Sequence, residues 1–114
     1  MTVNHRDTYT GITDDDRSLT IRELANVAAT PAEIDFASEF RAPGHVHLLK
    51  AAPELLAERQ GHTELGIALA GAADRAPAVV VCEMLDDETG GALSPRTHAH
   101  TLSATSSPTS KGRR

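Results

Sequence analysis

The feature that most constrains the fold is an uninterrupted apolar run around residue 80. Residues 78–84 read AVVVCEM, with three consecutive valines. β-Branched residues favour strands, and an apolar run without alternation is typical of a strand that is covered on both faces. We therefore expect a strand over Ala78–Met84 in the middle of a sheet, followed by a turn at Asp86–Gly91.

Two segments before this run have helical periodicity. The first is predicted over Asp15–Ala28, where Thr13 begins an acidic capping sequence and Thr30-Pro31 ends the segment. Its predicted buried face comprises Leu19, Leu24, Val27 and Ala28. The second helix is predicted over His62–Ala73, after Gly61, with an apolar face of Leu65, Ala68, Leu69 and Ala72.

The remaining segments are less regular. Val3–Tyr9 has the pattern of a weak strand, and Pro43-Gly44 predicts a turn. The region between the first helix and this turn contributes predicted core contacts from Ile34, Phe36 and Phe40.

Composition limits the chain to one small domain with a lean core. It has 114 residues, of which 3% are aromatic and one is cysteine. A single thiol excludes an intramolecular disulfide and a multi-thiolate zinc site. Nothing near Cys82 in the sequence would stabilise a thiolate, so Cys82 is expected in the core rather than as a nucleophile. Neither a bilayer-length apolar run nor a signal peptide is visible, which predicts a cytoplasmic protein without a membrane partner.

Charge is distributed unevenly along the chain. The net charge is −5, yet residues 91–114 contain four bases and no acid. Residues 95–114 are rich in Ser and Thr, which predicts a disordered basic tail after a domain at 1–94. A basic arm for nucleic acid is the alternative, but scattered bases and an acidic body argue against a nucleic-acid partner.

The start of the second predicted helix has the composition of a phosphate-binding site. Residues 59–64 read RQGHTE, and unpaired helix N–H groups, a close-approach glycine, a hydroxyl and a guanidinium all suit an anion. The structural alternative is that Thr63 only caps the helix while Arg59 pairs with Glu58 or Glu54.

Three histidines and one acid are further candidates. His45 and His47 alternate, so on a strand they share a face, and with His62 they have the donors for a zinc site. His62 beside the phosphate site suits a divalent cation, although two such histidines are also ordinary surface residues. Glu83 follows the valines, where it either emerges into water or acts as an acid or base.

Four segments together resemble one family, in order and spacing. They are TGITDDDR at 10–17, FRAPGHV at 40–46, RQGHTE at 59–64 and VCE at 81–83. The sequence from about Val3 to Ser94 is similar to the C-terminal part of archaeal-type 3,4-dihydroxy-2-butanone 4-phosphate synthases. The resemblance implies an α+β fold, a mixed α/β sandwich with a mixed sheet flanked by helices, incomplete here at both ends.

The resemblance also implies a reaction. D-Ribulose 5-phosphate would lose its C4 carbon as formate, giving L-3,4-dihydroxy-2-butanone 4-phosphate in riboflavin biosynthesis, with Mg²⁺ or Mn²⁺ as cofactor and a homodimer as the assembly. His45 and Glu83 would be catalytic, and His62 would bind metal. The implied substrate-binding residues are Thr10, Arg59, Gln60, Gly61, His62, Thr63 and Glu83.

The family's acidic loop, which supplies further metal and sugar contacts, has no counterpart before Thr10. The expected function is therefore that of a carbon-carbon lyase lacking part of its site. The alternative is a catalytically inactive fragment that binds a phosphosugar or a partner.

Overall fold

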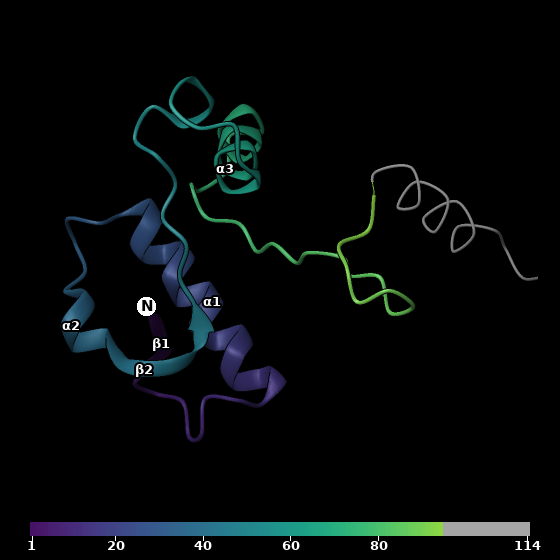
Figure 1. Cartoon of the computed structure of the whole chain (residues 1–114). Helices are drawn as coiled ribbons and strands as arrows, with labels where there is room; N and C mark the ends of the chain where they lie inside the picture. The colour runs from purple at the N-terminus through teal and green to yellow at the C-terminus, as the bar shows by residue number, and fades with distance from the viewer. Residues whose placement is uncertain (95–114) are drawn as a thin grey trace, which may run out of the picture. The chain divides into compact units, whose positions relative to one another are not determined.

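The structure, a computed structural model, describes residues 1–94. The chain divides into two units, residues 1–81 and 82–114, of which the second is described as far as residue 94. Within the described residues, the helices and strands lie in the first unit (Figure 1). These are β1 (Thr2–His5), α1 (Asp14–Ala29), α2 (Phe36–Glu39), β2 (Phe40–His47), the 3-10 helix η1 (Leu55–Ala57) and α3 (His62–Ala72).

The strands β1 and β2 form an antiparallel pair with an irregular register. Val3 pairs with Val46, but the next residue, Asn4, pairs with Arg41, so residues 42–45 of β2 are left out of the ladder with β1 and bulge. A Cβ on Gly44 would lie 2.0 Å from the carbonyl carbon of Val3, so only glycine permits this approach. The turn predicted at Pro43-Gly44 is therefore wrong, because both residues lie within β2.

Both predicted helices are confirmed to within a residue at each end. Thr13 caps α1: its side chain accepts a hydrogen bond from the backbone N–H of Asp16, and three aspartates occupy the first turn. The carboxylates lie near the positive end of the helix dipole, which stabilises them. The helix ends at Thr30, immediately before Pro31. Of the weak strand predicted over Val3–Tyr9, only the part up to His5 forms.

The apolar core of the described residues is small. Val3, Phe40 and Ala70 are the hydrophobic residues that are buried there. Phe36 stacks on Phe40 with ring centroids 4.7 Å apart, and the ring of His5 meets Phe40 edge on at 5.3 Å. Phe40 therefore confirms the predicted core contact, whereas Phe36 is only half-buried.

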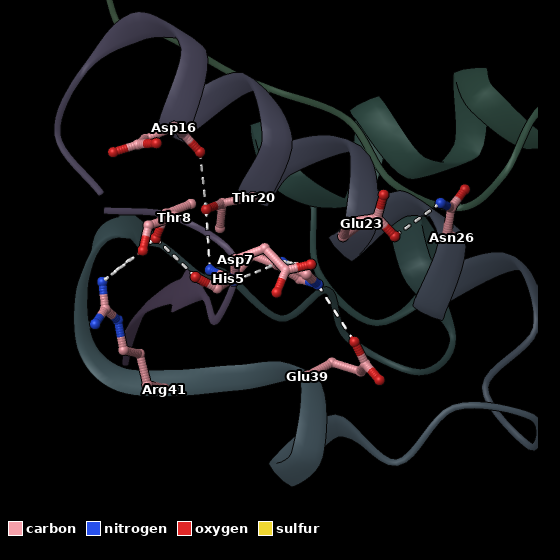
Figure 2. A network of polar contacts seen from close by, with 9 residues as sticks. All are labelled: His5, Asp7, Thr8, Asp16, Thr20, Glu23, Asn26, Glu39 and Arg41. Carbon is pink, nitrogen blue, oxygen red and sulfur yellow. Dashed lines mark hydrogen bonds and ion pairs between the residues drawn. The ribbon is translucent and has the colours of Figure 1, made fainter. Parts of the chain in front are cut away.

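Polar groups replace apolar ones between the strand pair and α1 (Figure 2). The hydroxyl of Thr20, fully buried, accepts from the backbone N–H of His5 at 3.0 Å and donates to the carbonyl of Asp16 at 3.0 Å. Nε2 of His5 lies 3.4 Å from the Glu39 carboxylate. Thr8 donates from its hydroxyl to the carbonyl of His5 at 2.7 Å. The Thr20 bonds attach α1 to β1, and the others tie β1 to Glu39 of α2 and to the loop after β1, where few apolar side chains are available.

The strand predicted over Ala78–Met84 is wrong for the described residues. This segment is not in a strand, and Val79, Val80 and Val81 are 42%, 70% and 49% exposed. A strand needs a neighbouring strand to bond with, and within residues 1–94 this segment is bonded to another segment only at its end, where the carbonyl of Met84 accepts from the N–H of Leu93 at 3.1 Å. Cys82 is exposed rather than in the core. The predicted turn at 86–91 does form, closed by an isolated bridge between Leu85 and Ala92.

Helices with an antiparallel strand pair confirm the α+β class. The sheet within residues 1–94 has two strands. The described helices do not include one that is long and apolar enough to cross a membrane. The predicted tail at 95–114 lies outside the described residues.

Candidate functional site

His45 lies in the bulge of β2 and is held by Asn4 of β1. The backbone N–H of His45 donates to Oδ1 of Asn4 at 2.7 Å, and Nδ2 of Asn4 lies 3.2 Å from Nδ1 of the His45 ring. Asn4 is 3% exposed, whereas the imidazole of His45 is exposed. A buried amide thus fixes both the backbone and the ring of a candidate catalytic residue.

The loop after β1 brings Thr10 to the same asparagine. The carbonyl of Thr10 accepts from Nδ2 of Asn4 at 3.4 Å. Gly11 has a φ of +84°, and a Cβ there would lie 2.0 Å from Nδ2 of Asn4, so glycine is required for both reasons. Arg41 supports the loop by donating to the carbonyl of Tyr9 at 2.9 Å. The structure therefore brings two predicted site residues, Thr10 and His45, together through Asn4.

The second group of predicted residues gathers at the start of α3. Gly61 is the N-cap and His62 is the first helical residue, so the interpretation of Thr63 as the helix cap is wrong. Arg59 pairs with Glu64, 3.4 Å from Nη1 to each carboxylate oxygen, and not with Glu58 or Glu54. Its side chain remains 66% exposed, and the other guanidinium N–H groups make no hydrogen bond to residues 1–94.

Glu64 is the residue that closes this helix start. Its side chain is fully buried, and its carboxylate accepts from the backbone N–H of Ala52 at 3.0 Å. That bond, with smaller contributions from its own N–H and from Arg59, lowers the pKa of Glu64 despite its burial. A Cβ on Gly61 would lie 2.4 Å from Oε2 of Glu64. The anion that Gly61 admits is therefore the protein's own carboxylate.

His62 and Gln60 are exposed beside this closed helix start. With Leu56, Gly61 and Leu65 they line a hollow of about 460 Å³. The N–H groups of the first helical turn have no partners within the helix, and Thr63 adds a half-buried hydroxyl. The N–H of Glu64 already bonds its own carboxylate, so Arg59, His62 and the backbone N–H groups before Glu64 are what remains for an anionic ligand.

A metal site is not completed by the described residues. Residues 1–94 contain no group of three or more His, Cys, Asp or Glu side chains able to hold an ion. The zinc triad of His45, His47 and His62 is therefore wrong for this part of the chain. His62 offers a single imidazole, whereas Mg²⁺ and Mn²⁺ take several oxygen ligands, so these residues alone do not fit either ion.

Glu83 belongs to the second unit, in which it is exposed. It emerges into solvent, as one of the two sequence interpretations expected. In the same unit Asp86 organises the turn: its carboxylate accepts from the Thr89 hydroxyl at 2.7 Å and from the N–H of Glu88 at 3.0 Å. The bond from Thr89 is the main reason that the pKa of Asp86 is lowered.

Two residues of this region were not identified from the sequence. Glu64 stands three residues after the N-cap, where an acid commonly reaches back to the helix start, so a capping signal was present. Asn4 had no such signal, because its partners are 6 and 41 residues away. Its role depends on the pairing of β1 with β2.

Helices packed with an antiparallel strand pair define an α+β protein. Comparison with known proteins agrees with that class. The model of the family "3,4-dihydroxy-2-butanone 4-phosphate synthase" matches residues 1–107. The chain belongs to this family.

Individual relatives are similar to most of the chain. A 3,4-dihydroxy-2-butanone 4-phosphate synthase of Archaeoglobus fulgidus is 60% identical over 94 residues, which are 80% of this chain and 40% of the relative. The same enzyme of Methanosarcina acetivorans is 58% identical over 95 residues, 81% of this chain and 38% of the relative. The chain thus spans about two fifths of the curated relatives that it matches most strongly.

A solved structure of the Candida albicans synthase supports the fold. It superposes with a TM-score of 0.76 at 35% sequence identity, covering 92% of this chain and 51% of that chain. The fold of the described residues is therefore that of one part of a synthase.

Proposed function

We propose that this chain carries part of the catalytic site of a 3,4-dihydroxy-2-butanone 4-phosphate synthase. The reaction would convert D-ribulose 5-phosphate to L-3,4-dihydroxy-2-butanone 4-phosphate and formate, a carbon-carbon lyase step of riboflavin biosynthesis. A relative from Staphylococcus saprophyticus, 36% identical over 88 residues, is named a riboflavin biosynthesis protein. The observation that carries the proposal is the start of α3, where the exposed guanidinium of Arg59 and the exposed imidazole of His62 lie beside the positive end of the helix.

The start of α3 would bind the phosphate of the substrate. Arg59 keeps its remaining N–H groups for the phosphate oxygens, while the pairing with Glu64 fixes the position of the guanidinium. Gln60, Gly61, His62 and Thr63 would complete the contacts from the first helical turn. Thr10, in the loop held by Asn4, would contact the substrate near His45.

Proton transfer is assigned to His45 and Glu83. Loss of C4 as formate requires protons to be moved between carbon and oxygen, which imidazole and carboxylate groups do near neutral pH. His62 would contribute one ligand to Mg²⁺ or Mn²⁺, and the oxygen ligands would come from outside residues 1–94. Bound there, the ion would polarise substrate oxygens.

A hybrid enzyme tests the catalytic proposal. The 94 matched residues of the Archaeoglobus fulgidus synthase are replaced by the matching residues of this chain, and formate release from D-ribulose 5-phosphate is measured with Mg²⁺. We expect formate and the four-carbon ketone phosphate in equal amounts. A folded hybrid, checked by circular dichroism, that releases no formate would overturn the proposal.

Variants of the hybrid test the individual roles. His45→Gln and Glu83→Gln should each lower kcat by about 10²-fold or more. The matched controls are His47→Gln, on the same strand, and Glu88→Gln, an exposed acid of the second unit. Equal losses from variant and control would contradict the assigned role.

The second candidate function is phosphosugar binding without turnover. The observation that favours it is the exposure of Arg59 and His62 at the start of α3, which can contact a phosphate without the participation of a further catalytic group. Calorimetry on the 114-residue chain distinguishes the two functions: saturable binding of D-ribulose 5-phosphate without formate supports binding alone. Absence of binding by a folded chain contradicts it.

We further propose a homodimer in the cytoplasm that does not bind nucleic acid. The net charge of −5 disfavours phosphate backbones as partners. Sedimentation velocity of the chain at several concentrations tests the dimer. A single species with the mass of one chain at all concentrations would contradict it.

A further inference from the structure

We propose that Asn4 is a positioning residue that holds the neutral imidazole of His45 with its proton on Nε2. The tautomer of His45 is inferred from the hydrogen bonds of Asn4 alone. Only the chemical role that this tautomer gives His45 rests on the proposed function. The inference narrows that role from acid or base to hydrogen-bond donor.

The first step is the orientation of the Asn4 amide. The backbone N–H of His45 lies 2.7 Å from one amide atom of Asn4, and a backbone N–H can only donate. The atom that it meets must be the acceptor, Oδ1. The NH₂ group of Asn4 therefore faces the imidazole and the carbonyl of Thr10.

The second step is the state of the His45 ring. The NH₂ group of an asparagine has two donors and no acceptor, and it lies 3.2 Å from Nδ1. Nδ1 must then accept, so it carries no proton. A neutral imidazole has one donor and one acceptor nitrogen, which places the proton on Nε2.

The third step is the confinement of Asn4. The side chain is 3% exposed, and Gly11 lies so close that even a Cβ there would collide with it. The second N–H of the amide donates to the Thr10 carbonyl. If the amide rotated by 180°, its oxygen would face the carbonyl oxygen of Thr10 and its NH₂ group would face the backbone N–H of His45. Both contacts would be repulsive, so the orientation of the amide is fixed.

The consequence concerns the exposed edge of the ring. Nε2 makes no hydrogen bond to residues 1–94, so its N–H is free to meet a ligand. His45 would offer a hydrogen bond to a substrate oxygen that gains negative charge. It would not be the group that removes the first proton.

The test is nitrogen NMR of the full chain labelled with ¹⁵N-histidine. Spectra are recorded at an alkaline pH at which the nitrogen chemical shifts themselves show neutral rings. His45→Gln identifies the His45 signals. We expect an unprotonated Nδ1 and a protonated Nε2 for His45. The fraction of the Nδ1–H tautomer should be smaller for His45 than for His47, whose ring makes no hydrogen bond to the described residues. A predominantly protonated Nδ1 would overturn the proposal.

Two substitutions separate positioning from simple packing. Asn4→Asp keeps the shape but replaces the NH₂ group by an oxygen, which should move the proton of His45 to Nδ1. Asn4→Ala should return His45 to the mixture seen for His47. The control is Asn26→Asp, at an exposed position of α1, which should leave His45 unchanged. An unchanged tautomer in folded Asn4→Asp would contradict the proposal.

The hybrid enzyme separates this inference from the proposed function. There, Asn4→Asp should lower kcat by about 10²-fold while KM changes less, because a wrong tautomer removes the donor but not the binding site. If NMR shows the tautomer inverted and kcat is unchanged, the catalytic role of His45 fails while positioning by Asn4 stands. If the hybrid is inactive throughout, the NMR result alone decides the positioning.

Discussion

At two positions of this chain, the lack of space for a side chain determines the residue type. Gly44 lies against the backbone of Val3, and Gly11 lies against the side chain of Asn4. Both contacts surround His45, so small residues create the space in which the candidate catalytic histidine is held. A glycine that serves packing and one that serves only the helix should therefore respond differently to the same substitution.

Gly44→Ala should destabilise the chain by about 1–3 kcal/mol, because its Cβ would overlap the backbone of β1. The matched control is Gly71→Ala in α3, where a Cβ meets nothing within 4 Å. Alanine favours a helix, so the control should be neutral or up to about 1 kcal/mol more stable. Urea unfolding followed by circular dichroism measures both, and equal stability of the two variants would contradict the assigned contact.

Glu64 predicts a dependence of stability on pH. Its pKa is lower in the folded chain than the unfolded value of about 4.3, chiefly because the N–H of Ala52 donates to it. The folded state therefore favours the ionised form: the stabilisation is present above pH 4.3 and is lost as the pH falls towards the folded pKa. Glu64→Gln should flatten the fall in melting temperature below about pH 4.3. If Glu64→Gln left the fall in melting temperature at low pH unchanged, this explanation would be contradicted. Glu88→Gln is the control.

At the scale of elements, the helices are encoded locally and the strand pair is not. The hydrogen bonds that begin and end α1 connect residues three to four apart. The bonds that form the bulge of β2 connect residues about 40 apart. A substitution at the end of a helix should therefore be sufficient to lower the stability of that helix.

Thr13→Ala should destabilise α1 by about 1 kcal/mol, because the N–H of Asp16 loses its acceptor. Thr13→Ser keeps the hydroxyl and should retain most of the stability. Urea unfolding of the two variants, monitored by helical circular dichroism, makes the comparison. Equal losses from alanine and serine would show that the cap does not contribute.

At the scale of the whole molecule, the described residues bury few apolar side chains and leave several large ones exposed. Val79, Val80 and Val81 are exposed, and with α1 and the end of β2 they line a cleft of about 500 Å³ in the first unit. Large exposed apolar surfaces bind apolar partners or promote association. The solved relative extends well beyond the part that this chain matches.

The full chain should accordingly bind an apolar fluorescent dye in its folded state. Replacing Val79, Val80 and Val81 by threonine should lower dye fluorescence and reduce association measured by sedimentation velocity. The chain in concentrated urea is the reference without a folded surface. Dye binding that the threonine variant leaves unchanged would place the apolar surface elsewhere.

Much of the candidate site was predictable because its residues stand in recognisable sequence segments. His45, Arg59, His62 and Glu83 come from motifs read along the chain. What those residues contact was not predictable: Arg59 pairs with Glu64, and the partner of His45 is Asn4. The zinc triad failed for the same reason, since alternation along β2 does not determine what lies opposite.

The sequence alone determined the two long helices, the cap of the first and the family motifs, because each depends on residues within a few positions of one another. The tertiary structure decided the bulge of β2, the orientation of Asn4 and the exposure of residues 79–81. Those features depend on which distant backbone lies alongside. An apolar run such as AVVVCEM becomes a strand only where a neighbouring strand accepts its hydrogen bonds.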